Sequence, residues 1–433
     1  MDRLLAIGMM SGTSVDGAVD TAALVTDGDS YVERRLVSAC TYEDRSGLRP
    51  VHHLTKAAEI AFRRAKGDYA GAETAYPGAL AEYVERTFGV SEPRTIAKRI
   101  EELGVAFHAG ANRVVTLSDV IARSTDVHMR AAEKILDELG DDAKKVAYVG
   151  YHGQTLYHAP FDHITVQVGN AQALADRLRL PVVFDFRRND IEHGGQGAPL
   201  APVYHRALLR KAGLPSAAVL NLGGTANITI VSAKTDEIIG FDTGPANGLI
   251  DRYVKEKAQL GLDEDSKLAF KGQVSEEALA VLMEKSIILG DGRNYLKIKP
   301  PKSLDIRDYK FDFPAFNALS LEDGCATLNA FTAECIVAGL DWIRGEMPEN
   351  WILCGGGARN PHLCAQIENR VGKKLGRAVK LISADQAGWS VQGMEAELFA
   401  FLAVRSARGL PLTFPGTTGV TRPLSGGRLF KPQ

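Results

Sequence analysis

The stretch "LLAIGMMSGTSVDGAVDTAALV" (4–25) places a turn rich in Gly, Ser and Thr between two apolar runs. Two such runs separated by Gly and Asp predict a β-hairpin. Glycine lets backbone N–H groups approach an anion without a side chain in the way, and hydroxyl groups add further donors. The stretch therefore fits either a plain strand connection or a turn that holds phosphate.

The same pattern returns in "SAAVLNLGGTANITIV" (216–231). Around both hairpins the chain repeats one order, which is hairpin, third strand, helical block, strand–turn–helix, strand and helix. The helical blocks cover about 54–139 and about 268–344. This repetition predicts an α/β fold of two duplicated lobes, each a mixed β-sheet with helices, and a central cleft. We expect the lobes at 1–205 plus 400–433 and at 206–399.

Composition narrows the class of protein. The 433 residues include 51 Lys and Arg against 53 Asp and Glu, and a net charge of -2 gives no general argument for binding nucleic acid or membranes. No apolar run approaches the roughly 18 residues of a membrane helix, and the short apolar start resembles a first strand more than a signal peptide. Five cysteines without a CxxC pair are typical of a reduced, cytoplasmic protein.

Four glycine turns each follow an apolar strand, at 8–17, 221–227, 240–248 and 355–357. The chain has no G-x-x-x-x-G-K-[ST] and no clear G-x-G-x-x-G that opens a helix after the first strand. A P-loop is thus excluded and a Rossmann-type oxidoreductase is poorly supported. A hairpin turn that holds phosphate, repeated in a second lobe, resembles the scheme of the sugar kinase–Hsp70–actin superfamily.

Candidate chemical groups follow other strands. Asp185 ends the apolar run "PVVFDF" and precedes Arg187, which suits a general base kept ionised by cations or a strand-end cap. The amide of Gln196 in "GGQGAPL" suits sugar hydroxyls, and His152 in "YHGQTLYH" fits a structural or a functional role.

Acidic residues of the turns are candidates for magnesium. Asp16 and Asp242 could act through water on an ion bound to phosphates. Glu395 begins the last long helix, where its charge is also explained by the helix dipole. The "PPKS" segment (300–303) is expected to be a surface turn.

The ordered segments "GMMSGTSVDG", "HGQT", "DFR", "GGQGAPL", "NLGGTANIT", "FDTGPANGLID", "PPKS", "CGGGARNPHL" and "EAELFAFLA" resemble the anhydro-N-acetylmuramic acid kinase family from residue 7 to about 405. The resemblance implies a two-lobed actin-like ATPase (ribonuclease H-like) fold and a homodimer. It also implies a cytoplasmic enzyme of cell-wall sugar recycling that uses ATP and Mg²⁺. The implied reaction phosphorylates O6 of a 1,6-anhydro sugar while water opens the bridge at C1.

The resemblance also assigns residues. It gives the base to Asp185 and magnesium to Asp16 and Glu395, while His152, Arg187 and Gln196 are our own candidates for binding the sugar. Its phosphate loop maps onto Gly12, Thr13, Ser14, Val15, Asp16, Gly17, Ala18 and Val19. The other glycine turns add ATP contacts at Asn221, Gly223, Gly224, Thr225, Asp242, Gly244, Asn247, Gly355, Gly356 and Gly357.

Three segments, 42–50, about 54–139 and 304–311, depart from the family's pattern and leave the exact sugar open. Anhydro-N-acetylmuramic acid is the leading substrate, and levoglucosan or another anhydro sugar is the alternative. A non-catalytic nucleotide switch of the actin or Hsp70 type would need the fold but not Asp185 at a sugar.

Overall fold

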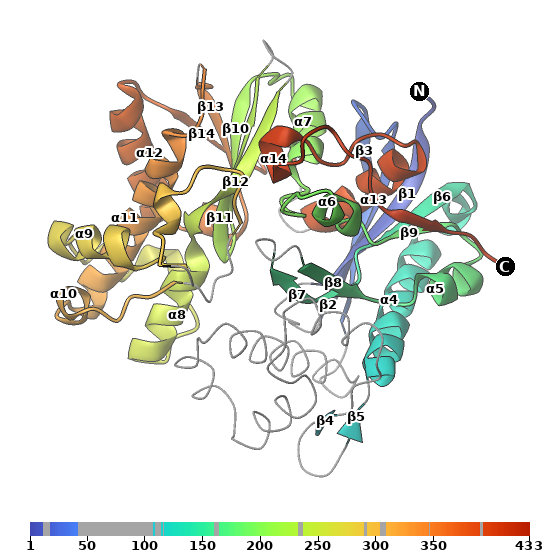
Figure 1. The fold of residues 1–433 in the computed structure, drawn as a ribbon, viewed down its shortest axis with the longest axis horizontal. Coiled ribbons are helices and arrows are strands. Elements are labelled where there is room, and N and C mark those ends of the chain that lie inside the picture. Colours follow the sequence, from blue (N-terminus) through green and yellow to red (C-terminus); the bar gives the residue numbers. More distant parts are fainter. Residues whose placement is uncertain are drawn as a thin grey trace. The chain divides into compact units, whose positions relative to one another are not determined.

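A computed structural model describes residues 1–11, 18–41, 107–108, 114–115, 117–159, 164–232, 237–289, 292–303, 309–345, 347–389 and 393–433 (Figure 1). The chain forms two compact units. The first comprises Met1–Ala207, Gln392–Pro415 and Val420–Gln433, and the second Leu208–Val391 and Gly416–Gly419. Among the described segments, no helix has the length and apolar character needed to cross a membrane.

The first unit is built on a six-stranded sheet with the order β15-β9-β6-β1-β2-β3. Its first three strands form an antiparallel meander, and β6 and β9 extend the sheet in parallel with β1. β15 closes the edge antiparallel to β9. The strands are β1 (Leu4–Met10), β2 (Ala18–Thr26), β3 (Val32–Thr41), β6 (Val146–Tyr151), β9 (Val182–Phe184) and β15 (Arg428–Phe430).

Helices cover both faces of this sheet. α13 (Met394–Ala407) packs on β1, β2 and β6, and α4 (Leu117–Leu139) packs on β1, β2 and β3. Successive strand residues point to opposite faces. Gly150 accordingly approaches Phe399 of α13, whereas the ring of Tyr151 lies 4.9 Å from that of His128 in α4.

Two strand glycines let α13 lie directly on the sheet. A Cβ at Gly8 would overlap the carbonyl oxygen of Ala396, and one at Gly150 would overlap that of Phe399. In the first apolar run of the hairpin, Gly8 is therefore required by helix packing.

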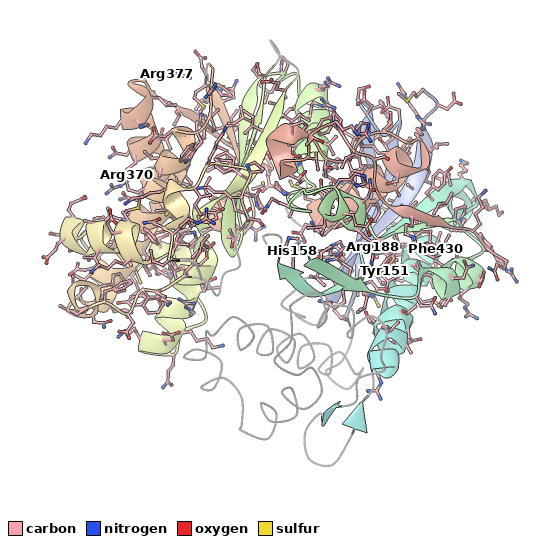
Figure 2. The ribbon with its side chains drawn as sticks, viewed as in Figure 1. Tyr151, His158, Arg188, Arg370, Arg377 and Phe430 are labelled. Carbon is pink, nitrogen blue, oxygen red and sulfur yellow. The ribbon has the colours of Figure 1, made fainter. Side chains whose placement is uncertain are left out.

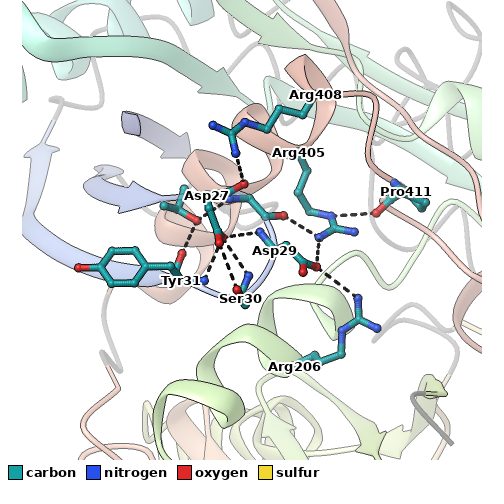
Figure 3. Close-up of polar contacts among 10 residues, drawn as sticks. Asp27, Asp29, Ser30, Tyr31, Arg206, Arg405, Arg408 and Pro411 are labelled. Atoms are coloured by element: carbon teal, nitrogen blue, oxygen red, sulfur yellow. Dashed lines mark hydrogen bonds and ion pairs between the residues drawn. The ribbon is translucent and has the colours of Figure 1, made fainter. Parts of the chain in front are cut away.

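A buried arginine fastens the turn between β2 and β3 to the end of α13 (Figure 3). Arg405 is 2% exposed and donates to the carbonyl oxygens of Gly28 at 2.6 Å and Pro411 at 2.9 Å. It also pairs with Asp29 at 3.1 Å, and Arg206 lies 3.8 Å from the same carboxylate. Because its charge is compensated on several sides, this guanidinium can stay buried.

The second unit repeats the topology on a five-stranded sheet with the order β12-β11-β10-β13-β14. Three antiparallel strands are again followed by two parallel ones. α11 is buried along most of its length and packs on β12, α8, α9 and α12, while Arg370 of α12 pairs with Glu334 of α11 (Figure 2). The elements are β10 (Ala217–Leu222), β11 (Thr225–Val231), β12 (Ile238–Pro245), β13 (Asn350–Cys354), β14 (Lys380–Ser383), α8 (Asn247–Ala258), α9 (Glu276–Lys285), α10 (Pro314–Asn317), α11 (Leu321–Leu340) and α12 (Pro361–Leu375).

Short elements complete the described chain. They are β4 (Phe107–His108), β5 (Val114–Val115), η2 (Gly140–Lys145), β7 (Gln154–Ala159), β8 (Ile164–Val168), α5 (Ala171–Leu178), α6 (Arg188–Glu192), α7 (Pro202–Lys211), η4 (Glu264–Ser266), η5 (Tyr295–Lys297), η7 (Gly356–Arg359) and α14 (Pro415–Thr418).

Both sheets share the strand order of ribonuclease H-like domains, so the predicted duplicated α/β fold is confirmed. Of the first helical block the structure describes α4, while 54–106 lies outside the described residues. The predicted lobe boundary at residue 400 would divide α13, which the structure places wholly with the first unit because the helix packs on its sheet.

Candidate active site

Three parallel strands of the first unit end at one edge of the sheet. Met9 of β1 pairs with Tyr151 of β6, and Gly150 pairs with Val183 of β9. The residues that follow these strands, Ser11, His152 and Asp185, are therefore brought to the same edge. Carboxyl ends of parallel strands are where α/β folds bind ligands.

Asp185 has an unusual backbone at this edge. Its φ of 63° lies in the left-handed region, which costs a non-glycine residue about 1 kcal/mol or more. Only 6% of the residue is exposed, and its Oδ2 accepts a charge-assisted hydrogen bond from Arg188 Nε at 2.7 Å. The turn therefore holds a buried carboxylate beside the guanidinium of Arg188, which Figure 2 labels.

A pocket of about 350 Å³ reaches this carboxylate. Its walls come from α6, the end of α13 and the segment that leads into β15. The lining residues are Asp185, Arg188, Asn189, Glu192, Ser406, Ser425, Gly426, Gly427 and Arg428. Polar and charged side chains therefore line most of the space beside the Asp185 carboxylate.

His152 contributes to this sheet edge by holding Arg187. Its Nδ1 lies 3.0 Å from the carbonyl oxygen of Gly153, and its Nε2 lies 3.2 Å from Arg187 Nε, which donates to it. Burial, with a further contribution from Arg187, holds the pKa of His152 well below its ordinary value. The neutral ring has both nitrogens engaged, so its contribution is to orient Arg187, which also donates to Gly197 O at 2.8 Å.

The turn that carries Gln196 is shaped by Asp190. The Oδ1 atom of Asp190 accepts from the Gly197 N–H at 2.6 Å, and a Cβ at Gly195 would overlap that oxygen. Within the described structure, the buried Oε1 of Gln196 has no hydrogen-bond partner. An orphaned buried acceptor points to a ligand that supplies the donor.

Residues 12–17 of the predicted phosphate loop, Asp16 included, lie outside the described residues. Ala18 and Val19 open β2, and Val19 is fully buried in the sheet. Ser11 precedes the loop, and its Oγ lies 3.0 Å from Gln154 Oε1 and 3.1 Å from His128 Nε2.

In the second unit the glycine turns meet at one sheet edge. Asn221 pairs with Cys354, Leu222 with Ala226, and Thr225 with Pro245, so the ends of β10, β12 and β13 are aligned. The Ala246 N–H donates to Gly224 O at 3.1 Å.

The turn after β13 lies directly on the end of β10. Gly355 has a φ of 79°, and a Cβ there would lie 2.6 Å from Asn221 Oδ1. At Gly356, by contrast, a Cβ would meet nothing within 4 Å. The edge thus offers backbone groups without side-chain cover, which is the arrangement that phosphate oxygens require.

A buried amide network supports this edge. Asn360 Nδ2 donates to Asn329 Oδ1 at 3.0 Å and to Asn247 Oδ1 at 3.1 Å. Its Oδ1 accepts from Ser266 Oγ at 2.5 Å and from the Leu363 N–H at 2.8 Å. Sequence reasoning missed Asn360, although an Asn before Pro at a helix start is an N-cap signal.

The expectation of a surface turn at 300–303 is wrong. Lys302 is 2% exposed, donates to Tyr295 O at 3.0 Å and lies 4.3 Å from the Tyr295 ring. Burial lowers the pKa of Lys302 to about 8. The carbonyl oxygen of Lys302 accepts from the Asp242 N–H at 3.1 Å. The lysine therefore packs against β12 and holds the backbone of Asp242, a residue predicted to contact ATP.

The magnesium residues remain predictions. Glu395 is exposed in the first turn of α13. Its neighbour Glu397 is buried and engaged, since it accepts from Tyr204 Oη at 2.6 Å and pairs with Arg34. Over the described ranges, no group of three or more His, Cys, Asp and Glu residues forms a metal site.

Comparisons with known proteins give the family. The family profile described as anhydro-N-acetylmuramic acid kinase matches residues 91–432. Proteins named anhydro-N-acetylmuramic acid kinase are similar to the whole chain. That of Methylobacterium nodulans is 37% identical and covers 99% of this chain and 100% of its own length. That of Azorhizobium caulinodans is 39% identical and covers 99% of each.

Among solved structures, a ROK family glucokinase from Streptomyces griseus covers 92% of this chain and 99% of its own, with 12% identity and a TM-score of 0.36. The profile match and the full-length identities above 30% decide the family. The chain belongs to the anhydro-N-acetylmuramic acid kinase family.

Proposed function

We propose that the protein is an ATP-dependent kinase of 1,6-anhydro-N-acetylmuramic acid. It opens the anhydro bridge by water attack at C1 and phosphorylates O6, which gives N-acetylmuramic acid 6-phosphate and ADP. Family membership supports the kinase role. The observation that carries the chemistry is Asp185, a buried carboxylate held at a strand end in a left-handed conformation beside Arg188.

The reaction needs one base. Water forms a bond to C1 and gives its proton to Asp185, while the C1–O6 bond breaks and its electron pair stays on O6. O6 then forms the new bond to the γ-phosphorus as the bond to ADP breaks. Because the departing oxygen becomes the nucleophile toward phosphorus, no separate acid is required.

Neighbouring residues prepare this carboxylate and the sugar. Arg188 donates to one carboxylate oxygen of Asp185 and fixes its position. The unpartnered Oε1 of Gln196 accepts from a hydroxyl or amide of the sugar. Arg187, oriented by His152 and Gly197, is placed to donate to a sugar oxygen.

ATP fits the second unit's edge because Gly356 leaves open space and Gly355 allows a close approach of two turns. The residues that would hold the nucleotide are Asn221, Gly223, Gly224, Thr225, Asp242, Gly244, Asn247, Gly355, Gly356 and Gly357, with Gly12–Val19 of the first unit. ATP with Mg²⁺ supplies the phosphoryl group and neutralises its charge. Asp16 and Glu395 are the proposed magnesium residues.

The experiment is a sugar panel. Purified protein with ATP, Mg²⁺ and anhydro-N-acetylmuramic acid is expected to form ADP and the 6-phosphate in equal amounts, with solvent oxygen incorporated at C1. If only levoglucosan is turned over, levoglucosan is the substrate and anhydro-N-acetylmuramic acid is not. Slow ATP hydrolysis that no sugar stimulates would identify a nucleotide switch.

Asp185→Asn tests the base. The amide keeps the shape and tolerates the left-handed backbone, so ATP binding is expected to persist while turnover falls at least 1000-fold. Asp141→Asn, a change at a side chain that is 96% exposed, is the control and is expected to keep full activity. A near-normal rate for Asp185→Asn would show that Asp185 is not the base.

The family resemblance also leads us to propose a homodimer that works in cell-wall sugar recycling in the cytoplasm. Sedimentation equilibrium tests the assembly, since a dimer has twice the 46.7 kDa mass of the chain.

A further inference from the structure

His128 is a fully buried imidazole that the proposed chemistry does not use. It lies in α4, on the sheet face opposite α13. Its Nδ1 lies 2.7 Å from the carbonyl oxygen of Ser124, and its Nε2 lies 3.1 Å from Ser11 Oγ. Burying a polar imidazole costs free energy that an apolar side chain of the same volume would not cost, so its hydrogen bonds need an explanation.

The protonation of His128 follows from its partners. A carbonyl oxygen only accepts, so Nδ1 carries the hydrogen and Nε2 is an acceptor. Burial lowers the pKa of His128 to about 4, which keeps the ring neutral near pH 7. Ser11 Oγ then lies between two acceptors, His128 Nε2 at 3.1 Å and Gln154 Oε1 at 3.0 Å, and its single hydroxyl hydrogen is shared between them.

Gln154 belongs to the turn that carries His152. In that turn, Gly153 has a φ of 74°, and a Cβ there would lie 2.6 Å from the Phe184 ring and 2.7 Å from Val168 O. The ring of His152 packs against that of Phe399, with 4.6 Å between the centroids and a tilt of 38°, and its Nε2 accepts from Arg187. The turn is therefore tied at its far end to Ser11 and at its near end to Arg187.

We propose that His128 is a positioning residue which, through Ser11 and Gln154, sets the geometry of the His152–Gln154 turn and so of Arg187 beside Asp185. The same contact fixes Ser11, the last described residue of the β1 end. His128 therefore acts on both sides of the reaction without touching either substrate. This inference rests on the proposed function, in which Arg187 contacts the sugar and the segment after Ser11 contacts ATP.

Kinetics of three variants test the proposal. His128→Leu and Ser11→Ala each remove the contact, and we expect the KM values for sugar and for ATP both to rise roughly fivefold, the effect of one or two lost neutral hydrogen bonds. His128→Gln places an amide near the Nε2 position, and it is expected to bring both KM values back to within twofold of the wild type. The double variant is expected to be no worse than the worse single one, since one contact is lost.

The readout separates positioning from mere stability. A destabilised protein has fewer active molecules, so its apparent kcat falls while both KM values stay unchanged. His205→Leu is the control, because it removes another buried imidazole from the first unit at a residue outside the site. Unchanged KM values in folded Ser11→Ala and His128→Leu, or additive effects in the double variant, would overturn the proposal.

The failure of the proposed function looks different. In that case the wild type turns over no anhydro sugar at all, and the same variants are then compared by the affinity for an ATP analogue measured by calorimetry. An affinity equal to that of the wild type in Ser11→Ala and His128→Leu also overturns the positioning role.

Discussion

Acid is expected to destabilise the first unit through its buried histidines. Burial lowers the pKa of His128 and of His205 to about 4, while an exposed imidazole titrates near 6.5. Between these values the unfolded chain binds protons that the folded chain does not. Stability therefore rises with pH across this window, is complete above about pH 6.5, and is lost as the pH falls toward 4.

The size of the effect follows from the shifts. A difference of about 2.5 units corresponds to about 3 kcal/mol per histidine over the whole window. Between pH 7 and pH 5 each histidine removes about 2 kcal/mol, so the pair removes about 4 kcal/mol. His152, whose pKa is also lowered by burial, acts in the same direction. A loss of this size is a large part of the 5–15 kcal/mol that stabilises a typical domain.

Hydrogen exchange is the suitable assay. The three tryptophans, Trp342, Trp351 and Trp389, all belong to the second unit, so fluorescence does not follow the first. Mass spectrometry of peptides from β1, β6 and α4, corrected for the intrinsic exchange rate, gives the free energy of opening at pH 7 and pH 5. We expect it to fall by about 4 kcal/mol or more in the wild type, because His152 adds to the contributions of His128 and His205.

Variants assign the effect. His128→Gln lacks the titrating group and is expected to reduce the loss by about 2 kcal/mol, and adding His205→Leu is expected to reduce it by about 2 kcal/mol more. Ser11→Ala is the matched control, because it removes the same hydrogen bond without removing the imidazole. The free energy of opening of Ser11→Ala is expected to be lower than that of the wild type at both pH values. The difference between pH 7 and pH 5 is expected to equal that of the wild type. An equal pH dependence in the wild type and the double histidine variant would refute the reasoning.

Other changes have defined outcomes. Gly8→Ala drives a Cβ into the Ala396 carbonyl and is expected to cost about 3 kcal/mol or more in thermal unfolding, since backbone must move; a loss under about 0.5 kcal/mol would contradict the packing. Gly356→Ala places its Cβ in open space, so it is expected to leave the melting temperature unchanged and to weaken binding of an ATP analogue in calorimetry. An unchanged affinity would contradict the proposed ATP site at the second unit's sheet edge. Lys302→Met removes a buried ammonium and is expected to be neutral or to stabilise the protein by up to about 3 kcal/mol in urea unfolding near pH 7. This gain is expected to shrink above pH 8, because the lysine of the folded wild type then loses its proton. A clear destabilisation would show that the contact of Lys302 with Tyr295 stabilises more than the burial of the charge costs.

The topology was accessible from the sequence because apolar runs and glycine turns repeat in the same order in both halves. The position of Asp185 at a strand end was accessible for the same reason. Its left-handed backbone was not, because that conformation is imposed by surrounding contacts rather than by local preference. The dipeptide "FD" alone gives no sign of it.

Side-chain burial was harder to predict. Lys302 follows two prolines, which suggests a turn in water, yet its stem and ammonium are enclosed by Tyr295 and β12. His128 sits on the core face of a helix, where a polar residue gives no local signal of a partner more than a hundred positions away. Such contacts between distant segments are set by packing, which a single sequence does not display.

The placement of α13 has a consequence for the order of folding. The second unit is almost contiguous in the chain, so its core can close soon after residue 391 leaves the ribosome. The first unit cannot close, because the sheet face at Gly8 and Gly150 has no cover until α13 follows it. During synthesis the N-terminal strands therefore stay without their covering helix until nearly the whole chain is made, and the unit whose synthesis begins first is the last to be completed.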